Sequence, residues 1–212
     1  MKIQIMKNIS ANNDLFAEKN RKYCNEHNIK LINIMASPGA GKTSTIKKIL
    51  EQINVPKDSI GIIEGDIASA IDAEDLEELG YNTIQINTGG GCHLSAHSIG
   101  EALQSLQIDC GVVFIENVGN LICPSAFDLG ENLKLLIASV PEGSDKPFKY
   151  ISMFEYVDII VLNKWDLAPY IDFDYEEFEK GVRAVNDKAP IIKLSCKTCE
   201  GIDELVSLLG GN

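Results

Sequence analysis

The residues from Asn87 to Ser98, NTGGGCHLSAHS, combine glycines with side chains that bind metals. Three glycines lead into Cys92 and His93, and His97 follows four residues after His93. A thiolate and an imidazole are ligands that suit Zn²⁺ or Ni²⁺. Successive glycines can also form a nest of backbone N–H groups for a phosphate, or simply turn the chain. The stretch alone leaves these three interpretations open.

A second glycine-rich stretch, ASPGAGKTST from Ala36 to Thr45, follows an apolar run that is typical of a buried strand. It resembles the phosphate-binding pattern G-x-x-x-x-G-K-[ST], in which Lys42 would reach the phosphate oxygens and the Thr43 hydroxyl would bind Mg²⁺. Ala36 departs from the first glycine of the pattern, which matters only if that position needs positive φ, where alanine costs about 1 kcal/mol. The predicted phosphate-binding residues are Gly39, Ala40, Gly41, Lys42, Thr43 and Ser44.

The sequence NKWDL, from Asn163 to Leu167, indicates that the bound base is guanine. At this spacing the Asp166 carboxylate accepts hydrogen bonds from the N1–H and the 2-amino group of guanine, and adenine has neither donor. A carboxylate left unpaired in a buried site costs several kcal/mol, so the motif favours GTP over ATP. Asn163 would hold the loop, and the stem of Lys164 would lie over the base.

The loop SCKTCEG, from Ser195 to Gly201, falls where guanine-binding enzymes offer a backbone N–H to the O6 atom. Ser195 and Cys196 are therefore included among the predicted guanine-binding residues. Cys196 and Cys199 also form a C-x-x-C pair, a spacing found in metal sites and redox motifs. A single pair lacks partner ligands, so its role stays open.

Two acidic residues at the ends of apolar runs are candidates for holding Mg²⁺. Glu116 begins the sequence ENVGN, where an acid can hold the ion through water and the Gly119 N–H can contact the γ-phosphate. Asp66, in EGDIAS, could touch the ion or orient the attacking water, and with Lys42 it forms the predicted catalytic pair. Capping of the next helix is the alternative role for Asp66. The expected Mg²⁺ contacts are Thr43, Asp66 and Glu116.

Cys123, in NLICPS, adds a second thiol to the metal-binding candidates. Its loop and the loop of Cys92 and His93 both follow predicted strands, so both would lie at the carboxyl ends, beside the γ-phosphate. These three ligands suit Zn²⁺ or Ni²⁺, and a second chain across a two-fold axis would supply the rest. The alternative is a glycine turn followed by a buried cysteine and a histidine at the start of a helix. His97, four residues after His93, either shares its helix face or is simply exposed.

These loops require a scaffold that brings the ends of several strands together. Short β-branched apolar runs indicate buried strands at Leu31–Met35, Ile60–Ile63, Thr83–Ile86, Val112–Ile115, Leu135–Val140, Val157–Leu162 and Ile191–Leu194. Helical spacing appears at Ser10–Glu26, with Ser10 as N-cap, and at Thr45–Gln52, Ala73–Leu79, Ile99–Leu106 and Tyr175–Val185. Alternating strands and helices predict an α/β protein of the P-loop NTPase type, with a doubly wound, mostly parallel sheet and helices on both faces.

Composition limits the classes of protein that fit. The 212 residues suffice for one domain, and 45% hydrophobic and 24% charged residues are typical of a soluble globular protein. We expect a single P-loop GTPase domain over residues 1–212 with an N-terminal helical segment at about 10–28. A net charge of −12 argues against nucleic-acid binding, and no apolar run is long enough for a membrane span. Without a signal-peptide pattern, the expected location is the cytoplasm, where six cysteines favour thiols over disulfides.

Six stretches together resemble the HypB family, GTPases that help to insert nickel into [NiFe] hydrogenase: MASPGAGKTS, EGDIAS, INTGGGCHL, FIENVGNLICP, SVPEGSDKPFKY and NKWDL. The combination of GGGCHL with ENVGNLICP is the most specific feature. The resemblance implies a GTPase that uses GTP/GDP and Mg²⁺, forms a homodimer on GTP binding, and holds Ni²⁺ or Zn²⁺ between subunits through Cys92, His93 and Cys123. It also implies two partners, a HypA-like nickel chaperone and the precursor of the hydrogenase large subunit.

Three other functions were compared with this one. The urease-maturation GTPases of the UreG group place their metal ligands as Cys-Pro-His, whereas Cys92 and His93 are adjacent here. A nucleoside or small-molecule kinase rarely needs a guanine-specific carboxylate, so NKWDL argues against it. A metal chaperone with a purely structural GTP site is the third alternative. The presence of Lys42, Thr43 and Glu116 argues for at least slow hydrolysis.

The expected rate of hydrolysis is low because the chain offers no obvious arginine finger. Its only arginines, Arg21 and Arg183, lie in predicted helices away from the phosphate loop. A positive group could come from a partner chain on dimerisation, with Lys146 or Lys149 of GSDKPFK as candidates. We therefore expect turnover well below that of typical enzymes.

Overall fold

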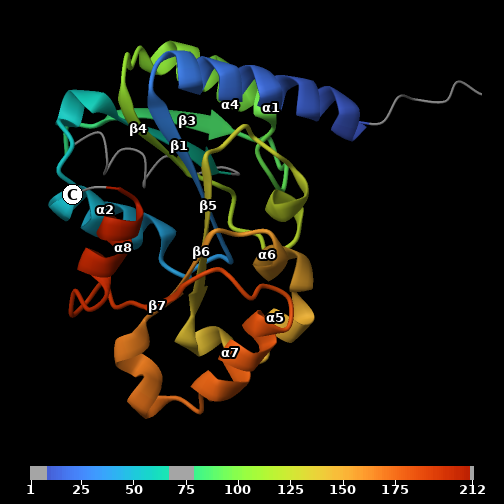
Figure 1. The fold of residues 1–212 in the computed structure, drawn as a ribbon, viewed down its shortest axis with the longest axis vertical. Coiled ribbons are helices and arrows are strands. Elements are labelled where there is room, and N and C mark those ends of the chain that lie inside the picture. The colour runs from blue at the N-terminus through green and yellow to red at the C-terminus, as the bar shows by residue number, and fades with distance from the viewer. Residues whose placement is uncertain (1–8, 67–78, 211–212) are drawn as a thin grey trace, which may run out of the picture.

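The computed structural model describes residues 9–66 and 79–210, and every structural statement below applies to that part of the chain. Its seven parallel strands form one sheet in the order β3-β2-β4-β1-β5-β6-β7 (Figure 1). The strands are β1 (Ile29–Ala36), β2 (Ile60–Asp66), β3 (Asn82–Asn87), β4 (Gly111–Glu116), β5 (Leu133–Ser139), β6 (Ile159–Asn163) and β7 (Ile191–Lys193). This topology confirms the predicted α/β class and the parallel sheet.

Helices cover both faces of the sheet. They are α1 (Ile9–Glu26), α2 (Lys42–Gln52), α4 (Ala96–Leu106), α5 (Lys146–Lys149), α6 (Ile151–Glu155), α7 (Tyr175–Arg183) and α8 (Ile202–Leu208). Short 3₁₀ helices occupy Lys57–Ser59, Cys123–Ala126, Val140–Glu142 and Trp165–Tyr170. Helices α2 and α8 pack on one face, whereas α1 with α4 and α6 with α7 cover two halves of the other (Figure 1).

Strand β1 shows why the buried strands have almost continuous apolar sequences. Ile32 and Ile34 belong to the core under α2 and α8, whereas Leu31 and Met35 pack on the opposite face. Successive side chains of a strand point to opposite faces, so a strand covered on both sides needs apolar residues at every position. The predicted strand segments are therefore found in the sheet, with ends that differ by a few residues.

Helix α1 packs along α4 and binds the loops beside it. Within α1, the Asn20 side chain donates to the carbonyl oxygens of Ala96, at 2.7 Å, and Leu129, at 2.9 Å. The Asn13 side chain accepts from the Ala96 N–H at 2.9 Å. The helix is already formed at Ile9, so the prediction that Ser10 is its N-cap is wrong. No helix within residues 9–66 and 79–210 is long and apolar enough to cross a membrane.

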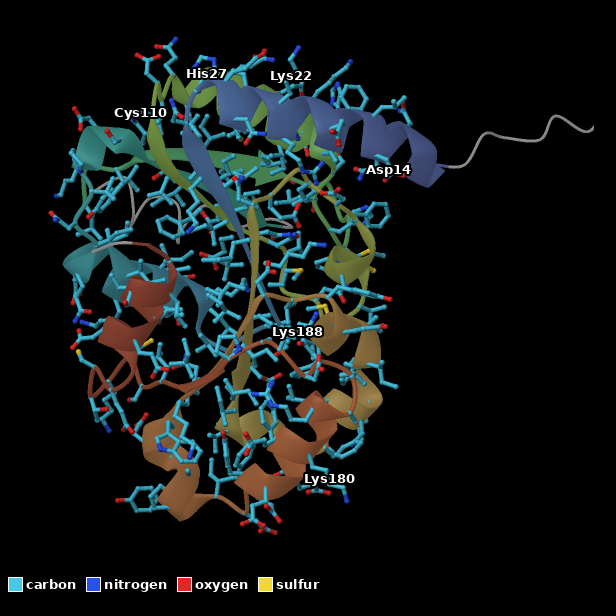
Figure 2. All side chains as sticks on the ribbon, viewed as in Figure 1. Asp14, Lys22, His27, Cys110, Lys180 and Lys188 are labelled. Atoms are coloured by element: carbon cyan, nitrogen blue, oxygen red, sulfur yellow. The ribbon has the colours of Figure 1, made fainter. Side chains whose placement is uncertain are left out.

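Labelled side chains mark the two ends of the molecule along its longest axis (Figure 2). His27, just after α1, and Cys110, just before β4, lie at the end where β1 and β4 begin, and Lys180 of α7 lies at the opposite end (Figure 2). The Gly111 N–H donates to the Asn28 carbonyl at 3.3 Å, which joins the amino ends of β1 and β4. The strands run from this end toward the loops that carry the predicted motifs.

Two helices begin earlier than their apolar spacing predicts, and a capping side chain explains one of them. Helix α4 begins at Ala96 instead of Ile99 because the Ser95 hydroxyl accepts from the Ser98 N–H at 3.1 Å. Helix α2 begins at Lys42 instead of Thr45, directly after the phosphate loop. Helices α5, α6 and α8 were not predicted. Of the predicted helix Ala73–Leu79, residues 73–78 lie outside the described residues, and Leu79 is in a turn.

Candidate functional site

The predicted nucleotide motifs gather at the carboxyl edge of the sheet. The phosphate loop follows β1, Glu116 ends the neighbouring strand β4, and Asn163 ends β6. The loop with Cys92 and His93 follows β3, at the same edge. In open parallel sheets this edge is where ligands bind, because the connections after the strands and the helix N-termini converge there.

Glycine is required at position 41 of the phosphate loop. Gly41 is the N-cap of α2 with φ of 101°, and a Cβ atom built on it would lie 2.4 Å from Asn163 Nδ2. Gly39 also has positive φ, 74°, which glycine adopts without strain. Ala36 lies in β1 and its φ is not positive. Its departure from the glycine pattern therefore causes no strain. The loop leads into the N-terminus of α2, a location that favours a phosphate.

Thr43 and Glu116, two of the three predicted magnesium ligands, are in direct contact. The Thr43 hydroxyl donates to Glu116 Oε1 at 2.8 Å, and Lys42 Nζ lies 4.0 Å from the same oxygen. Glu116 is only 5% exposed, so its carboxylate is held away from bulk water between these two groups. A hydroxyl and a carboxylate are oxygen donors of the kind that Mg²⁺ prefers, and the pair therefore fits this ion.

Two acidic residues, Glu64 and Asp66, belong to β2, the strand that pairs with β4. Asp66 is the last residue of β2, and its side chain lies outside the described residues. Glu64, two residues earlier, is buried and is the Cα partner of Glu116 in the pairing of β2 with β4. Register partners of parallel strands face the same side of the sheet. Glu64 was not predicted from the sequence, although its spacing of two residues from Asp66 in a strand was a signal for a second acid.

The guanine motif also supports the phosphate loop. Asn163 Nδ2 donates to the Ala40 carbonyl at 2.8 Å, and Lys164 Nζ donates to the Gly39 carbonyl at 2.7 Å. The Asn163 Oδ1 atom accepts from its neighbour's backbone N–H at 2.7 Å, so both ends of the amide are used. These contacts fix the spacing between the loop after β6 and the loop after β1.

Asp166 is oriented by the side chain of Ser195. The Ser195 hydroxyl donates to Asp166 Oδ1 at 2.7 Å. The Ser195 backbone N–H donates to the Glu200 carbonyl at 3.0 Å, so a backbone N–H for guanine O6 would come from a later residue of this loop. Ser195 is therefore connected to the site through its hydroxyl. A cavity of about 170 Å³ lies beside these residues, lined by Gly41, Ser44, Asn163, Lys164, Asp166, Leu167, Cys196 and Lys197.

The cysteine pair of this loop lies in two different environments. Cys196 is half-buried, with Sγ 3.5 Å from Thr45 Oγ1 and 3.6 Å from Asn163 Oδ1. Burial raises the pKa of the Cys196 thiol, which keeps it protonated and disfavours metal binding. Cys199 is exposed. Cys196 therefore contacts both α2 and the guanine motif, and it lines the cavity beside Asp166.

Cys92, His93 and Cys123 form a compact group of potential metal ligands. Their ligand atoms lie within 4.8 Å of one another, and no other such group of three occurs among residues 9–66 and 79–210. Cys92 Sγ is 3.6 Å from His93 Nδ1. The His93 ring stacks on Phe127 with 3.8 Å between ring centroids, which fixes the plane of the imidazole. Two thiols and one imidazole suit Ni²⁺ or Zn²⁺, and a further ligand must come from outside the trio.

The protonation of these ligands follows from their surroundings. Partial burial lowers the pKa of His93, which favours the neutral imidazole that binds metals. The contact with the Cys92 thiol raises the pKa of Cys123, because a second thiolate beside the first is disfavoured. His97 lies outside this group: its ring packs edge-on against Phe16 at 4.7 Å between centroids.

Three site residues carry contacts that sequence reasoning did not predict. Glu142 accepts from the Ser37 hydroxyl of the phosphate loop, and from the N–H and hydroxyl of Ser139, both at 2.8 Å. Asn117 and Asn120, in ENVGN, bind the backbone on both sides of the Cys92–His93 pair. The only advance signal was the spacing from Ser139 to Glu142, which fits a capping box.

Comparison with known proteins agrees with this geometry. Residues 30–193 match the family model of the CobW/HypB/UreG nucleotide-binding domain. The hydrogenase maturation factor HypB of Azotobacter chroococcum is 43% identical over 95% of this chain, and the chain spans 66% of that relative's length.

Two solved structures have the same fold over nearly their whole length. HypB from Archaeoglobus fulgidus is 38% identical, with a TM-score of 0.87 over 95% of this chain and 98% of that one. HypB from Helicobacter pylori, solved in complex with nickel, is 30% identical, with a TM-score of 0.88 over 93% of both chains. The chain therefore belongs to the HypB family of hydrogenase maturation factors, within the CobW/HypB/UreG nucleotide-binding domains.

Proposed function

We propose that this protein is a GTP-hydrolysing metallochaperone that binds nickel or zinc and assists nickel insertion into [NiFe] hydrogenase. Its metal affinity and its dimerisation are switched by GTP. The family membership supports the maturation role, and the H. pylori relative was solved with nickel. The observation that carries the proposal is the closeness of two sites, because the nucleotide residue Glu116 and the metal ligand Cys123 belong to one short segment.

The nucleotide residues have separate roles in this proposal. Phosphate binding uses Gly39, Ala40, Gly41, Lys42, Thr43, Ser44 and Gly119, and guanine binding uses Asn163, Lys164, Asp166, Ser195 and Cys196. Mg²⁺ is held by Thr43, Glu116 and Asp66, and Asp66 with Lys42 acts in hydrolysis. The ion supplies charge neutralisation at the phosphates when it is bound. The side-chain contacts among Lys42, Thr43 and Glu116 support this arrangement.

Gly119 is the proposed sensor of the γ-phosphate. It lies directly against the phosphate loop, since a Cβ atom built on it would be 3.2 Å from Pro38 Cα. Only three residues separate it from Cys123. A displacement of Gly119 after phosphate loss would therefore move Cys123 relative to Cys92, and the metal affinity would change with the nucleotide.

Hydrolysis is proposed to be slow in the isolated chain. Arg21 donates to Asp128 at 2.8 Å, and Arg183 donates to the Ala189 carbonyl at 2.7 Å, so both arginines have structural partners. A positive group would come from a second copy, with Lys146 or Lys149 of α5 as candidates. Lys146 Nζ lies over the Tyr150 ring, 4.9 Å from its centroid, a contact that it can leave at little cost.

The homodimer forms around the metal trio in this proposal, since a second copy supplies the ligands that one chain lacks. Residues 1–212 act as one GTPase domain with an N-terminal helical segment. The proposed partners are a HypA-like nickel chaperone and the precursor of the hydrogenase large subunit, and the proposed location is the cytoplasm.

One experiment tests the nucleotide and metal roles together. Molecular mass and bound nickel and zinc are measured with GDP, with a non-hydrolysable GTP analogue, and without nucleotide. We expect a dimer with the GTP analogue and a different metal affinity in the two nucleotide states. Cys92→Ala and Cys123→Ala should lose metal, whereas Cys110→Ala, which removes an exposed thiol elsewhere, should retain it. Unchanged hydrolysis in Lys42→Ala would contradict the assignment of the phosphate loop.

A further inference from the structure

Asn120 joins the two metal-binding loops through its side chain. Its Nδ2 donates to the Cys92 carbonyl at 3.4 Å. Its Oδ1 accepts from the Ile122 N–H at 2.8 Å and from the Cys123 N–H at 3.4 Å. A single amide therefore spans from the loop after β3 to the loop after β4. It contacts the backbone of both cysteine ligands without being a ligand itself.

The backbone of Asn120 is bound to the strand that carries the phosphate loop. Its N–H donates to the carbonyl of Ala36, the last residue of β1, at 2.9 Å. Gly119, the residue before it, packs against Pro38 of the phosphate loop. The nucleotide loop and both metal loops thus meet at one residue.

The side chain of the nearby Asn117 has different hydrogen-bond partners. Its Oδ1 accepts from the Leu94 N–H at 3.4 Å, just after the metal ligand His93. Its Nδ2 donates to Asn33 Oδ1 at 3.1 Å, and Asn33 in turn donates to Glu131 at 3.0 Å. Asn117, Asn33 and Glu131 are all buried, and Asn33 lies within β1. Asn117 therefore fixes one side of the Cys92–His93 pair to the rigid core.

We propose that Asn120 is a positioning residue that transmits the nucleotide state to the metal site, by moving the Cys92 side of the loop while Asn117 anchors the other side. This inference rests on the proposed function, in which metal affinity differs between GTP and GDP. A shift of Gly119 carries the Asn120 backbone with it, and the amide then turns, so that the Cys92 carbonyl and the Cys123 N–H, which it contacts at opposite ends, move in different directions. The distance between the two thiols changes as a result.

The Asn120 amide has a donor and an acceptor on separate atoms, which lets one end donate to Cys92 while the other accepts from Ile122 and Cys123. Asn120→Ala removes both contacts. Asn120→Asp keeps the acceptor for Ile122 and Cys123 but removes the donor to Cys92. Asn132→Ala is the matched control: Asn132 Oδ1 also accepts from a backbone N–H, that of Leu31, at 2.8 Å, but near the amino end of β1.

The test is a Ni²⁺ titration of the full chain with GDP and with a non-hydrolysable GTP analogue. For the parent and Asn132→Ala we expect affinities that differ by about fivefold or more between the two states, an ordinary size for coupling between sites. For Asn120→Ala and Asn120→Asp we expect a difference below about twofold. The nickel–thiolate absorption band and the affinity for the GTP analogue without metal should stay as in the parent.

The two failures can be told apart. A parent protein with equal nickel affinity in both states overturns the proposed switch and with it the role of Asn120. A parent with a difference that either Asn120 variant retains in full overturns the role of Asn120 alone. Loss of the nickel–thiolate band in Asn120→Ala would show that the residue merely builds the site, and that result also contradicts the proposal. Thermal melting of each variant establishes that it is folded.

Discussion

In the proposed function, the choice of base depends on single atoms of Asp166. Asp166 has one carboxylate oxygen bound by the Ser195 hydroxyl at 2.7 Å, and this contact restricts rotation of the carboxylate. The two donors of guanine would meet a group that is already oriented, so little conformational entropy is lost on binding. Adenine would leave the same carboxylate without those donors. Selectivity at this residue therefore depends on Ser195 as well as on Asp166.

The expected result for Asp166→Asn is a change of preference from GTP to XTP. The parent should bind GTP at least ~100-fold more tightly than ATP, because a site built for two donors rejects a base that lacks them. An amide can donate to the 2-oxo group of xanthine but repels the donors of guanine. Affinities for GTP, ATP and XTP are measured by competition. Asp172→Asn, an exposed acid nearby in sequence, should keep the preference for GTP, and an unmodified protein that binds ATP and GTP equally would refute the assignment.

A second prediction at this scale concerns Cys24, which is fully buried where α1 packs on the sheet. Burial raises the pKa of its thiol from 9.0 to about 11. The folded state thus holds this proton more strongly than the unfolded state, so the stabilisation is complete below pH 9 and is lost as the pH rises toward 11. A shift of this size corresponds to about 2–3 kcal/mol.

The measurement is the free energy of unfolding in urea, with reductant, at several values between about pH 8 and pH 11. Cys24→Ala lacks the thiol and should show a shallower decline over that range, although it is less stable throughout because of the cavity. The difference between the two curves isolates the thiol. Parallel curves for parent and variant would show that Cys24 contributes nothing to the pH dependence.

At the scale of elements, the junction of β1, the phosphate loop and α2 depends on close contact with the end of β6. Gly41 faces Asn163, and Asn163 cannot retreat easily because its amide binds Ala40 and the backbone of Lys164. The loop after β6 and the loop after β1 therefore form one rigid surface. In the proposed function, these contacts connect guanine recognition with phosphate recognition.

Gly41→Ala should therefore weaken GTP binding by at least about tenfold, through left-handed strain and the clash with Asn163. The affinity for GTP is measured by calorimetry, and folding is followed by thermal melting. Gly80→Ala is the matched control: its φ is also positive, 82°, but a Cβ there meets nothing within 4 Å. That variant should lose about 1 kcal/mol of stability and keep its GTP affinity. Equal losses of affinity in both variants would show that contact with Asn163 is unimportant.

Most strands could be predicted from the sequence because β1, β4, β5 and β6 are buried on both faces and carry almost continuous apolar runs, whereas the edge strand β3 is only half-buried. Short helices could not, since α5 and α6 have four and five residues, too few for a helical period to appear. Helix ends followed local capping chemistry. Ser95 is the N-cap of α4, whereas Ser10, also a serine, lies inside α1.

The candidate site was predictable where its motifs are local in sequence. Lys42, Thr43 and Asp166 are recognised from spacing alone. The roles of Asn120 and Glu142 depend on which strands are neighbours: β1 pairs with β4 and β5, which come much later in the chain. No local pattern indicates that order. Contacts between loops of different strands therefore required the structure.

At the scale of the whole molecule, the metal trio lies beside exposed apolar residues. Ile122, next to Cys123, is 61% exposed, and Ile151 begins α6 with 50% exposure. A hydrogen bond from Ser125 to Ser152 at 3.4 Å connects the 3₁₀ helix Cys123–Ala126, next to Ile122, with α6. Exposed apolar residues that cluster on a surface are typical of a contact with another chain. A second copy placed here would bring two metal trios together.

Ile122→Lys should prevent the dimer that the GTP analogue induces, because it would place two like charges close together across a two-fold axis. The same variant should bind GTP as the parent does, since Ile122 is outside the nucleotide residues. Tyr170→Lys is the control, as Tyr170 is 84% exposed and follows β6 in the 3₁₀ helix Trp165–Tyr170. Molecular mass by light scattering with the GTP analogue should show a monomer for Ile122→Lys and a dimer for Tyr170→Lys. A dimer of Ile122→Lys that still binds nickel like the parent would mean that the two copies meet elsewhere, and that each metal trio takes its remaining ligand from another source.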